Sequence, residues 1–222
     1  MSDALQVLNL YAGIGGNRKL WDDVTDVDVT AVEWDSDKAK IYRDYFPNDT
    51  VVETDAHEYL TEHLFDGWDF IWASPPCPTH SQMEQINHRK NGLRFPDMKL
   101  YQELIILEKY ASQEDFDYTV ENVVSYYDPL IKPKTLNRHY FWTNFVLPDK
   151  EVESSGISGN WKDENWRSFD YDKHEALMGY DLSGYDYTKQ KKSKMLKNCV
   201  NPELGKHILK AATTDRQITL FE

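Results

Sequence analysis

The stretch LQVLNLYAGIGG, Leu5 to Gly16, joins an apolar run to a turn that holds three glycines. A short run of Leu and Val is typical of a buried β-strand, and glycines let the backbone turn tightly and approach a ligand closely. The spacing is G-x-G-G, which differs from the G-x-G-x-x-G of a pyrophosphate site. We expect a helix to follow, through Leu20 and Trp21. The stretch therefore predicts the first strand of an α/β sheet with a ligand-binding turn at its end.

The first half of the chain repeats this alternation of strand and helix. Further strands are expected over residues 28–34, 50–54, 68–74 and 118–123, and helices over 36–46 and 97–113. Buried strands that alternate with helices form mostly parallel sheets with helices on both faces. The predicted fold class is therefore α/β, of the Rossmann-like type.

The second half has a different pattern. Residues 139–147 look like β-structure, residues 172–180 and 201–213 look helical, and Asp149–Trp166 is polar and without periodicity. We interpret Asp149–Trp166 as an inserted loop region and not as a second domain. Residues 1–222 are therefore expected to form a single domain.

The composition argues against several classes of protein. A net charge of −13 does not suit a protein that coats nucleic acid indiscriminately. Cys77 and Cys199 are the only cysteines and the histidines lack ligand spacing, so neither a disulfide framework nor a metal is expected. No apolar run suits a transmembrane helix, and the amino terminus lacks a signal-peptide layout. We expect a cytoplasmic protein with no membrane partner.

Acidic and aromatic residues follow the second and third predicted strands, where open parallel sheets bind ligands. Glu33 stands where nucleotide-binding sheets hold ribose hydroxyls, and Trp34 suits either an adenine ring or core packing. Asp55 suits an exocyclic amine, although an isolated Asp at this position is more often a helix N-cap. Together these strand ends predict a pocket for an adenosine with little phosphate, which fits S-adenosylmethionine better than NAD.

The stretch SPPCPTHS, Ser74 to Ser81, places a cysteine behind two prolines at the end of the fourth strand. A lone cysteine is more often a small buried hydrophobe than a nucleophile. Here the prolines restrict the backbone, and we expect a thiol near the start of a helix to have a lowered pKa and to attack as thiolate. Glu121 ends the fifth strand, and Asn122 is expected to orient it. The two strand ends predict a nucleophile and an acid that face one cleft.

Taken in order, these motifs resemble the DNA (cytosine-5) methyltransferases, in particular the short enzymes of phages and prophages. The resemblance runs through LNLYAGIGG, EWD, TDA, SPPCPTHS, VENV, NRHYFW and NCVNPELGKHIL, and spans nearly the whole chain. It implies an S-adenosylmethionine-dependent methyltransferase fold and methyl transfer to cytosine C5 in double-stranded DNA, in a bacterial or phage-infected cell. It also implies that the base is flipped into the site and attacked at C6 by Cys77, and that S-adenosylhomocysteine is released.

The resemblance implies a role for each motif residue. Cys77 would be the nucleophile, Glu121 the group that contacts cytosine N3 and its amine, and Arg138 a group that holds the flipped base. Residues 198–212 would include the C-terminal helix that closes on the cofactor site. The residues implied in cofactor binding are Tyr11, Gly13, Gly15, Gly16, Glu33, Trp34, Asp55, Pro76, Asn198 and Val200.

The sequence departs from the family's pattern at several positions. Pro78 stands where the family has Gln, Lys197 and Cys199 replace Gly and Ser, and NRHYFW holds a single arginine. Asp149–Trp166 is far shorter than the family's target-recognition domain. The bases that flank the target therefore stay open, and a homodimer or a partner that supplies sequence recognition is compatible with this reduced region.

Polar and basic residues supply candidates for contacts with nucleic acid, although a charge run is about as often solvated surface. The candidates are Ser81, His88, Arg89, Lys90, Lys189, Lys191, Lys192 and Lys194. Two other interpretations stay open: the same chemistry on RNA, since the family includes enzymes that act on transfer RNA, and a non-catalytic module that binds cofactor or nucleic acid. The G-x-G-G spacing disfavours a nicotinamide oxidoreductase.

Overall fold

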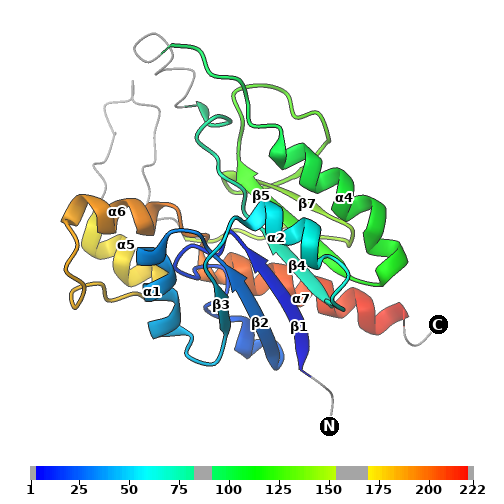
Figure 1. Ribbon diagram of the computed structural model, residues 1–222, viewed down its shortest axis with the longest axis horizontal. Helices are drawn as coiled ribbons and strands as arrows, with labels where there is room; N and C mark the ends of the chain where they lie inside the picture. The colour runs from blue at the N-terminus through cyan, green and yellow to red at the C-terminus, as the bar shows by residue number, and fades with distance from the viewer. Residues whose placement is uncertain (1–3, 83–91, 154–169, 220–222) are drawn as a thin grey trace.

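The computed structural model of the chain describes residues 4–82, 92–153 and 170–219. Within these ranges one sheet has the strand order β3-β2-β1-β4-β5-β7-β6 (Figure 1). The strands are β1 (Leu5–Leu10), β2 (Val27–Val32), β3 (Thr50–Val52), β4 (Phe70–Ala73), β5 (Asp117–Val123), β6 (Lys134–Leu136) and β7 (His139–Thr143). The first five run parallel, and β7 and β6 add an antiparallel edge beside β5. The mostly parallel α/β fold expected from the sequence is confirmed.

Helices cover both faces of this sheet. They are η1 (Trp21–Asp23), α1 (Ser36–Tyr45), α2 (Ala56–His63), α4 (Lys99–Glu114), α5 (Tyr171–Met178), α6 (Lys189–Lys197) and α7 (Pro202–Thr219). α2 and α4 pack on one face, against Leu8 and Ile71, while η1 and α7 pack on the other, against Val29 and Phe70. Figure 1 shows α4 in front of the strands and α7 behind them. Burial on both faces explains why the central strands are apolar almost throughout.

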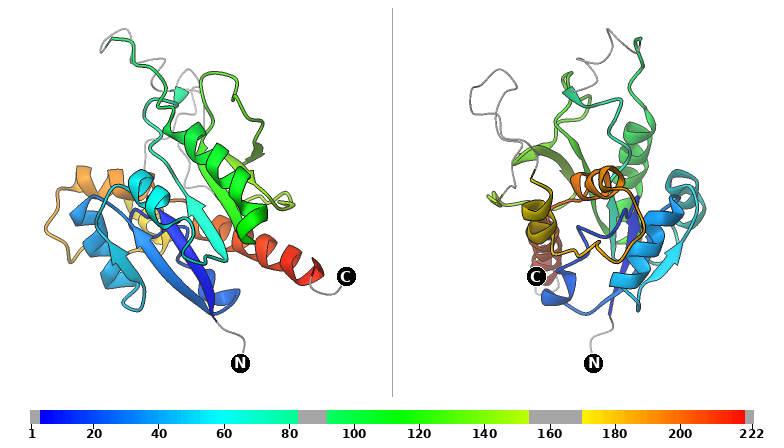
Figure 2. Two further views of the ribbon diagram at one scale, coloured as in Figure 1. Left: turned by 45° about the vertical axis from the view of Figure 1, so that its right-hand side comes forward. Right: turned by 90° about the vertical axis from the view of Figure 1, so that its left-hand side faces the viewer.

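α5 and α6 form a separate pair beside α1 (Figure 2). Their buried side chains, among them Met178 and Leu196, pack with Ile14 of the glycine turn and Ile41 of α1. The Tyr180 hydroxyl, just after α5, donates a hydrogen bond to the carbonyl oxygen of Ile14 at 2.6 Å. These contacts place α6 next to the turn that follows β1.

The prediction of a helix through Leu20 and Trp21 is wrong, because only the short η1 forms there. Successive turns replace it, with Arg18 N–H bonded to the Gly15 carbonyl at 3.1 Å and Trp21 N–H to the Arg18 carbonyl at 3.0 Å. The Asn17 side chain donates to Asn9 of β1 at 2.8 Å, which ties the segment to the sheet. Tertiary contacts thus override the local helical preference.

Other differences from the sequence-based expectation are smaller. The remaining expected strands and helices are present with shifted ends, and α2, β6 and α6 were not expected. Residues 154–166 of the expected loop region lie outside the described ranges, so its size and role stay predictions, as does the single-domain organisation. Within those ranges no helix is both long and apolar enough to cross a membrane.

Gly205 of α7 provides a test of how tightly this helix packs. A Cβ atom there would lie 2.1 Å from the carbonyl oxygen of Asn17, which is backbone and cannot rotate away. Alanine favours a helix interior by about 1 kcal/mol over glycine, but overpacking costs about 1–3 kcal/mol. We expect Gly205→Ala to lower the free energy of unfolding by about 1 kcal/mol or more, measured by urea denaturation.

Gly184→Ala is the matched control, because a Cβ atom at that position would meet nothing within 4 Å. We expect it to change the free energy of unfolding by less than about 0.5 kcal/mol. Equal stabilities of the two variants would contradict the close approach of α7 to Asn17.

Candidate active site

A cavity of about 790 Å³ opens at the carboxyl ends of β1, β2, β4 and β5. One part of its wall is the glycine turn and the end of β2, and another is the turn after β4 and the end of β5. Lys191 and Lys194 of α6, with Asn198 and Val200 after it, line a third part. A second hollow of about 850 Å³ lies between α4 and β7, but its lining holds neither a cysteine nor a glycine. The first cavity is therefore the candidate active site.

The turn after β1 presents backbone to the cavity. Tyr11 and Gly13 have left-handed φ values of 57° and 59°, and a Cβ atom on Gly13 would meet nothing within 4 Å. Gly16 also lines the cavity, and a Cβ atom there would lie 2.6 Å from the Val200 carbonyl oxygen. Gly15 is not among the lining residues; its φ of 86° makes the turn, and a Cβ atom there would lie 2.3 Å from Phe46.

Glu33 is held rigidly at the end of β2. It is 3% exposed, and its carboxylate accepts hydrogen bonds from the N–H groups of Gly13 and Asp35, both at 2.9 Å. Lys38 Nζ lies 3.4 Å from the same carboxylate. Trp34 lines the cavity and is 73% exposed, so its ring is available to a ligand and does not pack in the core.

Asp55 has a local structural role. Its side chain caps α2 by accepting hydrogen bonds from the N–H groups of His57 and Glu58, as the N-cap interpretation predicts. Its carboxylate also lies 3.6 Å from Lys99 Nζ, and Asp55 is not among the residues that line the cavity. A contact between Asp55 and an adenine amine therefore stays a prediction without support from the cavity's geometry.

Cys77 follows β4 in a tight turn at the cavity wall, together with Pro76. Its carbonyl oxygen accepts hydrogen bonds from the N–H groups of His80 and Ser81, at 3.0 and 3.1 Å. Burial raises the pKa of the thiol, and the negative charge of Glu121 raises it further. The lowered thiol pKa expected from the sequence is therefore wrong, because desolvation and a like charge dominate at this position.

Glu121 lies at the end of β5, which pairs directly with β4. The residue is 7% exposed and lines the cavity with Cys77. Asn122 does not orient it, in contrast to the sequence-based expectation: its amide donates to the Pro75 carbonyl at 3.0 Å and its oxygen accepts from Val123 N–H at 3.0 Å. Asn122 therefore joins the end of β5 to the turn that carries Cys77.

His139 is the residue that contacts Glu121. Its Nδ1 lies 2.5 Å from Glu121 Oε1, and the residue lines the cavity. Arg138, the residue expected to hold the flipped base, is exposed and is not among the lining residues. Arg138 belongs to the turn between β6 and β7, whereas His139 is the first residue of β7, which pairs with β5. The single arginine in NRHYFW is the signal that could have directed attention to its neighbour.

The residues expected to contact nucleic acid lie in different places. Lys191 and Lys194 line the cavity, and Lys191 also pairs with Asp37 of α1. Lys189 and Lys192 belong to the same helix but are not among the lining residues, and Ser81 forms an isolated β-bridge with Ser125. His88, Arg89 and Lys90 lie outside the described ranges. Among the residues that the structure describes, no cluster of His, Cys, Asp and Glu suits a metal ion.

Comparison with protein families finds a match for the amino-terminal part of the chain. Residues 5–107 match the family described as C-5 cytosine-specific DNA methylase. The resemblance inferred from the motifs is confirmed. The matched methylase segment contains the glycine turn, Glu33, Trp34 and Cys77, and it ends before Glu121. No curated protein sequence is a significant match to the chain.

Two solved structures, each under 25% identical to the chain, show the same fold. The Entamoeba histolytica methyltransferase EhMeth aligns at 13% identity with a TM-score of 0.59, over 97% of this chain and 99% of that chain. The S. pombe Dnmt2 methyltransferase aligns at 12% identity with a TM-score of 0.58, over 98% and 99%. A protein encoded within an E. coli prophage aligns at 22% identity with a TM-score of 0.38, over 56% of this chain and 34% of that chain. The methylase match over residues 5–107 supports methylation of cytosine, and the solved structures support the fold alone.

Alkylation with iodoacetamide tests the charge coupling in the site. Because the thiolate reacts and the thiol does not, Cys77 should be labelled slowly at pH 7 and faster as the pH rises through its raised pKa. Glu121→Gln removes a like charge, so it should lower the thiol pKa and speed labelling at pH 7. Mass spectrometry measures the rate at each cysteine.

Two controls accompany this measurement. Burial raises the pKa of Cys199 to about 12, so this thiol should stay nearly unlabelled at pH 7. Glu203→Gln replaces an exposed carboxylate of α7 and should leave the labelling of Cys77 unchanged. Labelling of Cys77 that is no faster in Glu121→Gln than in the wild type would contradict the proximity of the two charges.

Proposed function

We propose that the chain transfers a methyl group from S-adenosylmethionine to C5 of a cytosine in DNA, through a covalent bond between Cys77 and C6. The observation that carries the proposal is the meeting of a thiol and a carboxyl group in one cavity, beside a glycine turn and a buried acidic residue. The methylase match over residues 5–107 supports this class of reaction.

S-Adenosylmethionine fits the part of the cavity between the glycine turn, Glu33 and Trp34. The open space at Gly13 lets a ligand approach the backbone, the Glu33 carboxylate suits ribose hydroxyls, and the exposed Trp34 ring suits an adenine face. Asn198 and Val200 border the same space. A cavity of about 790 Å³ is large enough for a nucleoside cofactor beside a base. The bound cofactor supplies the electrophilic methyl group that C5 acquires.

Cys77 and Glu121 share one negative charge in this mechanism. The pKa of the thiol is raised while Glu121 is ionised, so protonation of Glu121 favours the thiolate. The same proton is the one that the base needs, because an acid at N3 draws electrons from the ring and makes C6 open to attack. The pair is therefore set for one state, in which sulfur is the nucleophile and the carboxyl group is the acid.

The covalent steps balance without another group from the protein. Cys77 sulfur forms a bond to C6 of the flipped cytosine while Glu121 gives its proton to N3, which makes C5 electron-rich. After methylation, C5 loses its proton to solvent and the bond between sulfur and C6 breaks. N3 then returns its proton to Glu121. Both side chains end in the state in which they began.

DNA is the proposed substrate, and α6 is the proposed contact with its backbone. Lys191 and Lys194 stand at the cavity, where they would meet the phosphates that flank a flipped base. We further propose that the chain acts in the cytoplasm of a bacterial or phage-infected cell. The segment Asp149–Trp166 is too short to recognise a DNA sequence by itself, so a second copy of the chain or a partner would supply this recognition.

Methyl transfer from labelled S-adenosylmethionine to unmethylated duplex DNA tests the proposal, with folded RNA in parallel. We expect label on DNA with the wild type, none above background with Cys77→Ala, and cofactor binding by calorimetry in both. Glu121→Gln should slow transfer by a factor of about 10² to 10⁴, the usual contribution of a general acid. Label on RNA alone would replace the substrate, and turnover by Cys77→Ala would contradict the covalent mechanism.

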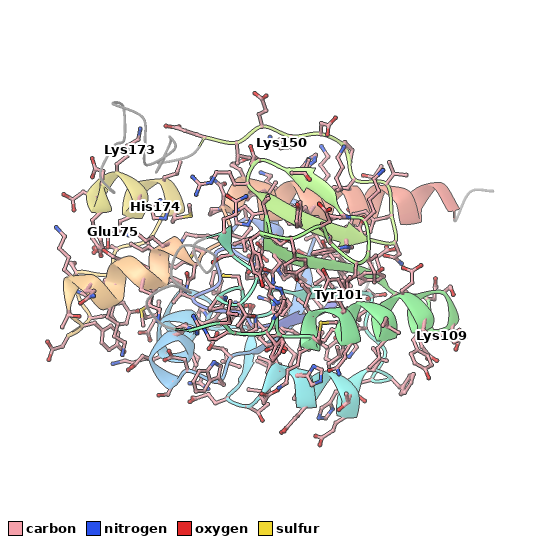
Figure 3. All side chains as sticks on the ribbon, turned by 90° about the horizontal axis from the view of Figure 1, so that it is seen from above. Tyr101, Lys109, Lys150, Lys173, His174 and Glu175 are labelled. Carbon is pink, nitrogen blue, oxygen red and sulfur yellow. The ribbon has the colours of Figure 1, made fainter. Side chains whose placement is uncertain are left out.

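Lys194→Ala tests the contact of α6 with the nucleic acid backbone. Loss of one phosphate contact should weaken DNA binding and reduce the slope of log K against log salt by about 0.9. Fluorescence anisotropy at several salt concentrations measures both quantities. Lys109→Ala is the matched control, because Lys109 is an exposed residue of α4, on the opposite side of the molecule from α5 and α6 (Figure 3). An unchanged salt slope in Lys194→Ala would exclude this role.

A further inference from the structure

The antiparallel pairing of β5 with β7 places His139 on the same face of the sheet as Glu121. In this register Glu121 lies opposite Phe141 and Val123 lies opposite His139. Residues two positions apart on one strand share a face, so Glu121 and His139 are diagonal neighbours. Their side chains meet, with Nδ1 of His139 2.5 Å from Oε1 of Glu121.

The contact occupies one oxygen of Glu121 and leaves the other available. Among the described residues, the Glu121 side chain forms one hydrogen bond, between its Oε1 and His139 Nδ1, and Oε2 has no such partner. Asn122, the neighbouring polar residue, is engaged with Pro75 and Val123. Cys77 and Glu121 face the same cavity, with the His139 side chain 32% exposed at its edge. His139 is thus in contact with the acid, while the roles described above make no use of it.

We propose that His139 is a positioning residue that determines which oxygen of Glu121 carries the proton for the base. The inference rests on the proposed function and concerns the same site. In the tautomer that carries its proton on Nδ1, His139 donates to Oε1, so Oε1 is the acceptor oxygen of the carboxyl group and the proton resides on Oε2. The proton is thereby directed away from the sheet neighbour and toward the bound cytosine.

The hydrogen bond from His139 also strengthens as the proton leaves. While Glu121 is protonated, His139 Nδ1–H donates to a neutral carbonyl oxygen. When the O–H bond of Oε2 breaks and the N–H bond at N3 forms, Glu121 becomes a carboxylate, and hydrogen bonds to ionised groups are roughly twice as strong. An interaction that is stronger in the transition state than in the ground state accelerates the chemical step and leaves binding unchanged. Loss of His139 should therefore lower the rate of methyl transfer and leave the affinities for DNA and cofactor unchanged.

Two variants of His139 separate this role from mere packing. His139→Leu keeps the bulk and removes the donor, and His139→Asn keeps an N–H donor close to the position of Nδ1. The test is the rate of single-turnover methyl transfer with saturating S-adenosylmethionine and duplex DNA. His139→Leu should be slower by about 10- to 100-fold, the range for a hydrogen bond to a charged group, with unchanged affinities. His139→Asn should recover the rate to within about fivefold of the wild type.

The double variant His139→Leu with Glu121→Gln provides a measurement that packing alone would not affect. If His139 acts through Glu121, the double variant should be no slower than Glu121→Gln alone, to within about twofold. His63→Leu is the matched control. His63, the last residue of α2, forms a similar contact with Asp66, with 2.7 Å between Nδ1 and Oδ2, and neither residue lines the cavity. This control should transfer methyl groups at the wild-type rate.

The outcomes distinguish the inference from the proposed function. A near wild-type rate in His139→Leu, no recovery in His139→Asn, or additive losses in the double variant would each overturn the positioning role while Cys77-dependent transfer persists. A wild-type chain that methylates neither DNA nor RNA would overturn the proposed function, and the inference with it. Loss, recovery and non-additivity together would establish His139 as the residue that positions the acid.

Discussion

Direct packing of backbone on backbone joins the two ends of the chain around the site. Gly16 of the turn after β1 lies against the Val200 carbonyl, and Gly205 of α7 lies against the Asn17 carbonyl, both at separations that a Cβ atom would not allow. The Tyr180 hydroxyl adds a hydrogen bond to the Ile14 carbonyl. Without these approaches Asn198, Val200 and α6 would not reach the glycine turn, and the cavity would lack one wall. The methylase match ends at residue 107, yet the cavity requires segments far beyond that point.

The chemistry of the site depends on a second constraint, the confinement of a thiol and a carboxyl group within one cavity. Desolvation disfavours the thiolate, and a charged Glu121 disfavours it further. In the proposed mechanism the pair carries one charge, because attack by sulfur and proton donation to N3 both require that state. The edge strand β7 completes the arrangement, because its antiparallel register brings His139 to the acid. A sheet without this strand would leave Glu121 without the partner that orients it.

The sequence correctly predicted those elements that depend only on a short stretch of the chain. The apolar runs, the glycine turn and the N-cap at Asp55 depend on neighbours in sequence, and they form as expected. The sequence-based predictions fail where contacts with residues distant in sequence determine the local structure or the pKa of a group. The segment around Leu20 is pinned by Asn9 and α7, and so turns replace a helix. The thiol pKa of Cys77 cannot be read from the sequence, because it depends on how deeply the thiol is buried and on the charge of Glu121 beside it.

The sequence by itself determined the class of fold and the order of the motifs, and it supplied the two groups that are proposed to react, because strand periodicity, glycine spacing and residue chemistry are local properties. It also directed attention to the carboxyl ends of the strands, where the cavity lies. Only the tertiary structure decided which residue supports Glu121. Asn122 is adjacent in sequence but its amide bonds Pro75, while His139 is distant in sequence and arrives through strand pairing. Arg138 lies in the turn between β6 and β7, whereas His139 is the first residue of β7 and lines the cavity, and only the folded chain shows this difference.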